Sequence, residues 1–533
     1  MRMKRRRLFA VFAAVLLLSA CIYYSVPSYS GANALAESIS GSDLFKEANV
    51  QGQTIDMYLI GGQSNASGNS LNIPNGVAVN EVLYIGEREE NIGQSGMFCA
   101  NSVTTGLGIN TLYMGPEYGM ALRLREQYSV TNPACIFKSA EGGTNLLDVT
   151  TGHLPSRFGN WYPRSLWDSP EHDGVSHTGY LYYRFIENFK AAYNLLVSKG
   201  YTPVVKAFCW MQGESDRGAV AEYEKLIKIF IRDMREDIGK ITNTDQSGML
   251  FIMGEISTTF SSYDQQAGNQ MFIDMQREVA ACGDPVKVVT VDTSDLPING
   301  PGGAIIGSDK SHWNGTQMKT LGERFAEKAL EYADKNYISL PQESKVKVSV
   351  DKLMFNDGDQ VNITFSPLSD YFYENVKLNG QDITSQITNN IYTIASASGN
   401  YELTLDVRER TFYNITYSYD KERGDYDRRK STAFKLYEGE DLIVVPKPKD
   451  GYYIGSVTFN GTALSEGVNA RYILEGGVTE SGEVKIEFYR DGETAQDNAA
   501  PVEESGCGKG ADAAKVLSIA AALVMAAFVL KKF

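Results

Sequence analysis

The sequence predicts an α/β protein, a three-layer α/β/α domain around a parallel sheet of flavodoxin-like type, followed by two small all-β modules and a C-terminal membrane-type helix. From residue 55 to about 336, short apolar runs typical of buried strands alternate with amphipathic stretches typical of helices. From about 345 to 490 helical periodicity is absent, and Val, Ile, Thr, Tyr and Asn dominate. Residues 516–530 form a continuous apolar run.

The elements of the first part follow from its apolar pattern. We expect strands at 55–60, 135–137, 204–211, 250–254 and 286–291. We expect helices at 115–127, 180–199, 219–238, 264–281 and 315–337. The segment after residue 65, rich in Asn, Gly and Thr, is expected to be irregular as far as the first of these helices. This order of strands and helices favours a parallel sheet covered on both faces.

The β region contains an internal repeat with a spacing of about 80 residues. Its matching stretches are 357–361 with 438–442, 371–373 with 452–454, and 376–380 with 457–461. The last pair ends in Asn-Gly, which is a hairpin-turn signal. We therefore expect two β-sandwich-like modules, at 345–410 and 411–490, that act either as a spacer or as carbohydrate-binding modules.

Both ends of the chain carry signals for export. Residues 1–36 combine a basic start with an apolar run at 8–18, as export segments do. Leu18-Ser19-Ala20-Cys21 resembles a lipoprotein box that would lipidate Cys21, and Ala34-Leu35-Ala36 resembles a signal-peptidase site. An uncleaved anchor is the third alternative. Each of them places the bulk of the chain outside the cytoplasm.

The C-terminal segment indicates attachment to a membrane. Residues 491–512 form a polar spacer, and 513–533 are expected to be a transmembrane anchor that ends in Lys531-Lys532 on the cytoplasmic side. No LPxTG sorting motif is present in the sequence. We expect an extracellular protein that is attached to the bacterial cell surface or membrane.

Composition excludes some classes of function. The formal net charge of −15 argues against nucleic acid as a partner. The six cysteines include no CxxC pair, which argues against a zinc site. A Cys99–Cys135 disulfide is compatible with export, but the sequence does not decide it. We expect no metal and no cofactor.

The chemistry centres on Gly61-Gly62-Gln63-Ser64-Asn65, which follows the first expected strand. Two glycines allow a sharp turn, and a serine placed after it is exposed at the edge of the sheet among backbone amides. That setting suits a nucleophile, although an ordinary turn is the alternative. Polar stretches at 140–144 and 212–216 also follow strands directly, so all three are expected at the carboxyl edge of the sheet.

A serine nucleophile needs a base, and the base needs an orienting carboxylate. The four histidines are His153, His172, His177 and His312. Asp309 stands three residues before His312, so it can bond one ring nitrogen while the other faces Ser64. A solvated loop histidine is the alternative. The aromatic segment at 150–177 is either a lid that contacts sugar or an ordinary packed loop.

Five motifs in order resemble a known family. They are Gly62-Gln63-Ser64-Asn65, Gly115-Pro116-Glu117, Gly142-Gly143-Thr144, the stretch from Trp210 to Asp216, and Asp309-Lys310-Ser311-His312. Together they resemble the sialate O-acetylesterase and acetylxylan esterase branch of the SGNH (GDSL-like) hydrolases. The resemblance covers roughly residues 53–336 and implies an esterase domain at 53–338.

The resemblance implies a role for each matching residue. Ser64 would be the nucleophile, His312 the general base and then acid, and Asp309 the residue that orients His312. Glu214 is a rival for that last role, and a cap or a buried hydrogen-bond network is the structural alternative for Glu214 and Asp216. The implied oxyanion hole consists of the backbone amides of Ser64 and Gly143 and the side-chain amide of Gln212. The implied substrate-binding residues are Gln63, Asn65, Glu117 and Trp210.

The expected function is that of an extracellular serine carbohydrate esterase. It would remove O-acetyl groups from glycans of sialic acid or xylan type through an acetyl-serine intermediate, without metal or cofactor. Two alternatives stay open: a catalytically idle surface adhesin that binds glycans, and an SGNH esterase that acts on a non-carbohydrate ester.

Overall fold

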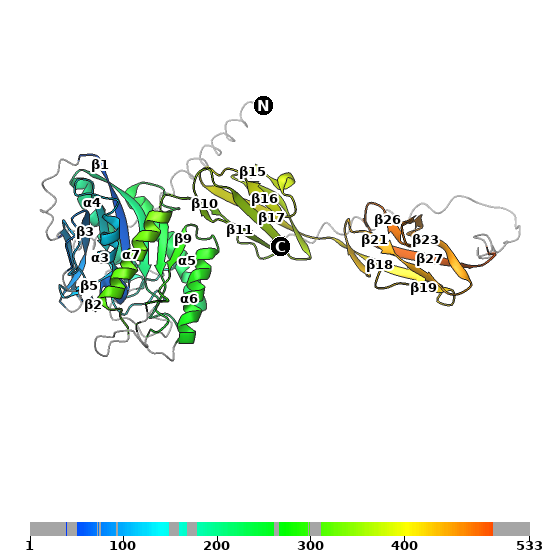
Figure 1. Cartoon of the computed structure of the whole chain (residues 1–533), viewed down its shortest axis with the longest axis horizontal. Helices are drawn as coiled ribbons and strands as arrows, with labels where there is room; N and C mark the ends of the chain where they lie inside the picture. The colour runs from blue at the N-terminus through cyan, green and yellow to red at the C-terminus, as the bar shows by residue number, and fades with distance from the viewer. Residues whose placement is uncertain are drawn as a thin grey trace, which may run out of the picture. The chain divides into compact units, whose positions relative to one another are not determined.

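The computed structural model describes residues 39, 51–71, 73, 76–91, 94–148, 159–167, 178–260, 266–296, 298 and 311–493 (Figure 1). The chain divides into two compact units, Met1–Arg408 and Glu409–Phe533. The first unit holds the α/β domain and one β module, and the second holds another β module.

The α/β domain is built on a seven-stranded sheet in the order β4-β3-β6-β1-β7-β8-β9. Its strands are β1 (Gln53–Gly62), β3 (Val82–Asn91), β4 (Gln94–Ala100), β6 (Ala134–Lys138), β7 (Tyr201–Met211), β8 (Leu250–Gly254) and β9 (Val288–Val291). All neighbours pair in parallel except β4, which pairs antiparallel with β3 at the edge. The predicted parallel sheet is therefore confirmed. Every parallel strand presents its carboxyl end at the same edge of the sheet.

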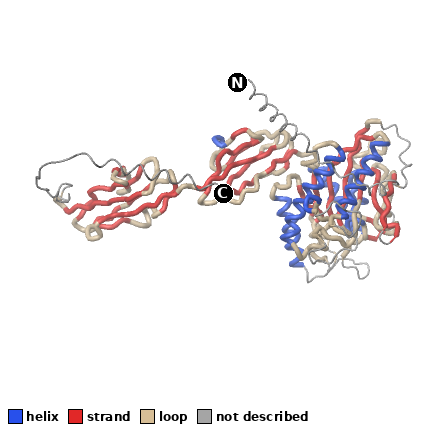
Figure 2. Tube along the Cα trace, turned by 180° about the vertical axis from the view of Figure 1, so that it is seen from behind, coloured by secondary structure: helices blue, strands red, loops and turns tan. Residues whose placement is uncertain are grey.

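Helices cover both faces of this sheet and make it a three-layer structure (Figures 1 and 2). The helices are α3 (Pro116–Leu124), α4 (Tyr180–Ser198), α5 (Val220–Thr242), α6 (Gln266–Ala281) and α7 (Gly315–Tyr332). α3 and α7 pack against each other on one face, while α4, α5 and α6 are neighbours on the other. The apolar residues of the helices face the sheet, and the core includes a group of aromatic side chains around Trp161, Trp210 and Phe230.

The segment expected to be irregular contains two full strands, which corrects the sequence prediction. β3 carries Gly86 and Glu87, which are uncommon in strands, and for this reason the residue pattern did not predict a strand here. The Glu87 carboxylate is nevertheless buried, because Arg184 and Asn188 of α4 donate hydrogen bonds to it. The short strands β2 (Ser70–Leu71) and β5 (Tyr113–Met114) pair with each other in the same region.

The first β module contains two sheets. β10 (Asn336–Ser339) lies in a five-stranded sheet with β12 (Met354–Phe355), β17 (Tyr401–Glu409), β14 (Tyr371–Leu378) and β15 (Gln381–Asp382). β11 (Val346–Val350), β13 (Val361–Pro367) and β16 (Ile391–Ile394) form the second sheet. The expected last helix stops at Tyr332, and the chain enters β10 after only three residues.

The second β module repeats this arrangement. Its larger sheet has five strands: β20 (Lys435–Tyr437), β18 (Phe412–Tyr419), β27 (Gly482–Arg490), β23 (Tyr452–Phe459) and β24 (Thr462–Ala463). Its smaller sheets contain β21 (Leu442–Val444), β26 (Tyr472–Leu474), β25 (Ser465–Glu466), β19 (Gly424–Tyr426) and β22 (Pro446–Pro448). Each module has its own hydrophobic core.

The Asn-Gly hairpin signals of the repeat are confirmed. Asn379 and Gly380 both have positive φ and join β14 to β15, and Asn460 and Gly461 do the same between β23 and β24. Positive φ at both central residues is the conformation of a type I′ turn, whose twist matches that of the flanking strands. The sequence repeat is therefore a structural repeat.

The predicted export segment and C-terminal anchor, with the Cys21 lipidation site, lie outside the described residues. No helix in the described part of the chain has the length and apolar character needed to cross a membrane. Cys99 and Cys135 are both buried free thiols, so the disulfide considered from the sequence is not formed.

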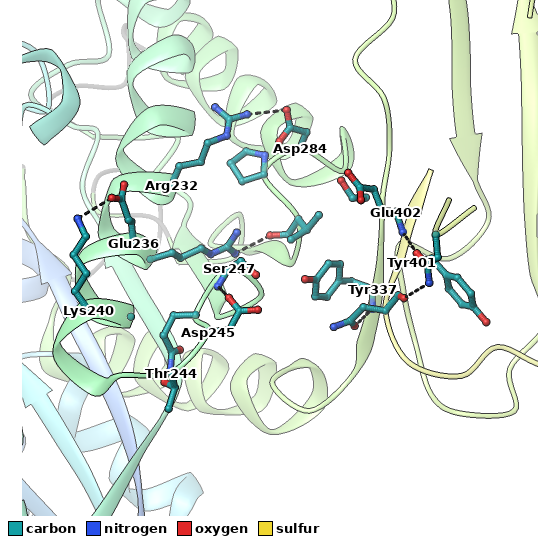
Figure 3. Close-up of a pocket in the computed structure, with 18 of the residues that line it drawn as sticks. Arg232, Glu236, Lys240, Thr244, Asp245, Ser247, Asp284, Tyr337, Tyr401 and Glu402 are labelled. Carbon is teal, nitrogen blue, oxygen red and sulfur yellow. Dashed lines mark hydrogen bonds and ion pairs between the residues drawn. The ribbon is translucent and has the colours of Figure 1, made fainter. Parts of the chain in front are cut away.

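A cleft of about 950 Å³ lies within the first unit, between α5 and the first β module (Figure 3). Arg232 of α5, Ser247, Tyr337 of β10 and Glu402 of β17 are among its lining residues. Ser247 lies three residues before β8, so the cleft is located at the amino ends of the parallel strands. It is therefore separate from the carboxyl edge, where the sequence motifs meet.

Candidate active site

Ser64 lies at the carboxyl end of β1, at the start of the short helix α2 (Ser64–Ser67). The turn before it requires glycine, because Gly62 has a φ of +134° and a β-carbon there would lie 2.1 Å from the carbonyl oxygen of Met211. The amide of Gln63 donates to that same oxygen at 2.9 Å, which joins the turn to β7. Ser64 is 7% exposed, so it is accessible from one side only.

The loop after β6 passes beside Ser64. A β-carbon at Gly142 would lie 3.5 Å from the β-carbon of Ser64, and Gly143 has a φ of +66°. The loop is fixed at its start by the Glu141 amide, which donates to Gly62 O at 3.1 Å. At its end, Trp161 Nε1 donates to the hydroxyl of Thr144 at 3.0 Å.

The backbone amides of Ser64 and Gly143 donate no hydrogen bond to any described residue. Both are therefore available to a ligand beside the Ser64 hydroxyl, as two of the three predicted oxyanion donors require. The loops that carry them are neighbours because the parallel sheet brings the ends of β1 and β6 to one edge.

The residues on each side of His312 tie its segment to the stretch of chain that follows Ser64. The Ser311 carbonyl accepts a hydrogen bond from Asn65 Nδ2 at 3.3 Å. The Trp313 carbonyl accepts one from the Ser70 hydroxyl at 2.6 Å, and the Trp313 side chain is buried. The ring atom Nε2 of His312 lies 3.4 Å from Asn69 Nδ2. That same Nδ2 would be 3.7 Å from a β-carbon at Gly142, so His312, Asn69 and the Ser64 loop converge.

Glu214 is buried next to this group. Its Oε1 accepts a hydrogen bond from Asn65 Nδ2 at 2.7 Å, while its Oε2 has no partner among the described residues. Burial raises the pKa of Glu214, and the Asn65 hydrogen bond and the nearby charge of His312 act in the opposite direction. Asp309, the other carboxylate predicted to orient His312, lies outside the described residues.

Gln212 and Asp216 form a buried network that joins the loops after β6 and β7. Gln212 Nε2 lies 3.2 Å from Gln63 Oε1, 3.0 Å from Thr144 O and 2.5 Å from Asp216 Oδ2. Asp216 also accepts hydrogen bonds from the side chain of Asn145 and the amide of Leu146. Burial raises the pKa of Asp216, and these hydrogen bonds lower it. These contacts agree with the structural alternative for Asp216, which is a place in a buried hydrogen-bond network.

The four predicted substrate-binding residues are all buried. Gln63 and Asn65 contact other site residues through their side chains. Glu117 is ion-paired to Lys138 at 2.9 Å beneath α2, and Trp210 packs against Trp161 and Phe230 in the core. The structure therefore does not bring Glu117 or Trp210 to the surface of the site.

Two residues that the sequence analysis did not single out belong to this region. Asn69 approaches His312, and Lys138 donates to the carbonyls of Ser67 and Leu107 at 3.1 and 2.7 Å. The one available signal for Lys138 was a charged residue at the end of an apolar strand. Within the described ranges, no three His, Cys, Asp or Glu side chains are grouped as metal ligands would be.

The parallel sheet with helices on both faces, with Ser64 at its carboxyl edge and the segment of His312 bonded to Asn65, is the architecture of an SGNH-type hydrolase. A family model described as carbohydrate esterase, sialic acid-specific acetylesterase, matches residues 54–331, which is more than half of the chain. The chain belongs to this family. It is therefore a carboxylic ester hydrolase, and the predicted resemblance is confirmed.

Several solved structures are similar to the chain. An Arabidopsis thaliana protein is 16% identical with a TM-score of 0.34, and the match covers 52% of this chain and 98% of that chain. NanS is 14% identical with a TM-score of 0.38, with 53% and 98% covered. A carbohydrate acetylesterase from Xanthomonas citri is 14% identical with a TM-score of 0.33, with 61% and 65% covered. No curated protein matches the chain.

Proposed function

We propose that the protein is an extracellular carbohydrate O-acetylesterase that acts through an acetyl-serine intermediate. The proposal is supported by the surroundings of Ser64: its own amide and that of Gly143 are unused, and Asn65 and Asn69 contact the segment that carries His312. A nucleophile, a base and oxyanion donors at one point are the parts that acyl transfer needs.

The proposed reaction has two halves. Ser64 Oγ attacks the acetyl carbonyl while His312 accepts the hydroxyl proton, and the amides of Ser64 and Gly143 hold the resulting oxyanion. The intermediate collapses when His312 returns the proton to the sugar oxygen, and the C–O bond to the sugar breaks. Water then attacks the acetyl-enzyme with His312 again as base, and acetate and free Ser64 result.

Glu214 and Asp309 are alternative partners of His312 in this proposal. Glu214 is favoured by its position, because its charge interacts with His312 and Asn65 fixes one of its oxygens. The same Asn65 amide also contacts the carbonyl of Ser311, so one side chain links the carboxylate to the histidine segment. Asp309 is favoured by its spacing in the sequence.

For the substrate we propose an O-acetylated sialic acid rather than xylan. The description of the family model supports this choice. The predicted attachment to the outer surface through the 513–533 segment, with Cys21 as a second anchor, would place the enzyme where it meets extracellular glycans. The β modules would serve as a spacer or bind glycan themselves.

The test is acetate release by the full chain in detergent, with 9-O-acetyl sialic acid and acetylated xylan compared side by side. Ser64→Ala is the control and is expected to release no acetate from either substrate. Release by the wild type alone, with sialic acid preferred, supports the proposal. If neither substrate yields acetate and a fluorophosphonate probe leaves Ser64 unlabelled, the idle adhesin is favoured instead.

A further inference from the structure

The oxyanion hole of this site lacks its expected side-chain donor. Gln212 was predicted for that role, but its Nε2 lies within hydrogen-bond distance of three acceptors. A primary amide nitrogen carries only two hydrogens, so this group has none left for a substrate. Turning the amide around would place its oxygen against the Asp216 carboxylate and the Thr144 carbonyl, which are both acceptors. A third donor therefore has to come from another residue.

Asn69 is the side-chain amide that faces the reacting atoms. Its Nδ2 lies 3.4 Å from His312 Nε2 and would be 3.7 Å from a β-carbon at Gly142. That β-carbon position is itself 3.5 Å from the β-carbon of Ser64. The Asn69 amide therefore contacts the base, and it borders the same point beside Gly142 as the side chain of Ser64. The His312 contact uses at most one of its two N–H hydrogens.

The backbone on both sides of Asn69 is fixed by its contacts. Gly68 before it has a φ of +97°, and a β-carbon there would lie 2.7 Å from both Gly108 Cα and Gly115 N. Ser70 after it begins β2 and is bonded to the carbonyl of Trp313. Asn69 itself is only partly exposed, and its Oδ1 is buried without a hydrogen-bond partner in the described part of the chain. A donor that is carried on a fixed backbone has less to reorganise during the reaction.

We propose that Asn69 Nδ2 is the third oxyanion donor, beside the backbone amides of Ser64 and Gly143. It donates to the former carbonyl oxygen of the acetyl group once that oxygen becomes negative. The inference rests on the proposed function, since it assigns a donor to the same tetrahedral intermediate. The role of Gln212 is then to join the loops after β6 and β7.

The experiment measures kcat, KM and the pH–rate profile for p-nitrophenyl acetate with the full-length protein. The variants are Asn69→Ala, Ser64→Ala as the inactive reference, and Asn132→Ala as a matched control at the opposite edge of the sheet. We expect Asn69→Ala to lower kcat by about 10²–10³-fold, the usual effect of losing one such donor, with KM changed by less than about threefold. Asn132→Ala should leave both constants unchanged, and thermal unfolding should show that each variant is folded.

Three outcomes would overturn the inference. If kcat of Asn69→Ala stays within about threefold of wild type, Asn69 is no oxyanion donor, while Ser64-dependent activity still supports the proposed function. If kcat falls and the acid limb of the pH–rate profile shifts with it, Asn69 acts by positioning His312 instead. If the wild type is inactive, or Ser64→Ala is as active as the wild type, the proposed function fails and this inference fails with it.

Discussion

The buried ion pair beneath the nucleophile should make Lys138 one of the most sensitive positions in the domain. Lys138 and Glu117 have side chains that are 2% and 0% exposed, and their charged atoms are 2.9 Å apart. The ammonium group also donates to the carbonyls of Ser67 and Leu107, and the second carboxylate oxygen accepts the Gly115 amide. All of these partners lie around α2, so the pair holds the helix that begins with Ser64.

Replacing Lys138 with Met keeps an unbranched side chain, one heavy atom shorter, and removes the charge. The carboxylate of Glu117 then stays buried without its cation, which typically costs 3–5 kcal/mol, or roughly a factor of 10²–10⁴ in the folding equilibrium. Adding Glu117→Gln removes the orphaned charge while keeping an oxygen for Gly115. We expect the double variant to be more stable than Lys138→Met by about 1–3 kcal/mol.

Urea unfolding followed by tryptophan fluorescence measures this effect in the right domain. All four tryptophans, Trp161, Trp167, Trp210 and Trp313, lie in the α/β domain, so unfolding of the β modules does not contribute. A loss below about 1 kcal/mol for Lys138→Met would refute the reasoning. A double variant that is no more stable than Lys138→Met would show that the pair does not act as a unit.

Two further predictions follow from burial and close packing. Burial raises the pKa of Glu214 above 4.5, so its ionisation destabilises the native state at neutral pH and not below 4.5. Glu214→Gln should therefore have a higher melting temperature than wild type at pH 7, and this difference should shrink as the pH falls below 4.5. A difference in melting temperature that grows on acidification would contradict the reasoning. A β-carbon at Gly322 of α7 would lie 2.0 Å from the carbonyl oxygen of Pro116 in α3, so Gly322→Ala should cost about 1–3 kcal/mol in urea unfolding. Gly268→Ala, a helical position in α6 with open space around it, should stabilise by up to about 1 kcal/mol and is the control.

The sequence was sufficient for the features that depend on local pattern. The apolar runs before residues 61, 140 and 212 are β1, β6 and β7, and their parallel pairing puts the polar motifs at one edge. The Asn-Gly turns were equally predictable, because their conformation is set by two adjacent residues.

Features that depend on distant partners were not predictable. Glu87 can lie in a buried strand only because two distant residues donate hydrogen bonds to its carboxylate. They are Arg184, which also neutralises the charge, and Asn188, and they are 97 and 101 residues away. Glu117 was expected to bind substrate because the sequence does not show that it is buried in an ion pair with Lys138. In the same way, nothing in the spacing of Gln212 and Asp216 shows that they bond each other and so withdraw the amide from the substrate. The role of Asp309 stays a prediction.

The position of α7 has a mechanical consequence. His312 stands three residues before this helix begins, and β10 of the first β module begins four residues after it ends. The helix has 18 residues and is therefore about 27 Å long. It connects the segment of His312 at one end to the first β module at the other. Tilting it about its far end by one degree would displace the histidine end by roughly 0.5 Å. The contact of Gly322 with α3 resists such a tilt. A displacement of the module end of α7 would thus move the histidine end as well, and the close packing of α3 and α7 at Gly119 and Gly322 limits that movement.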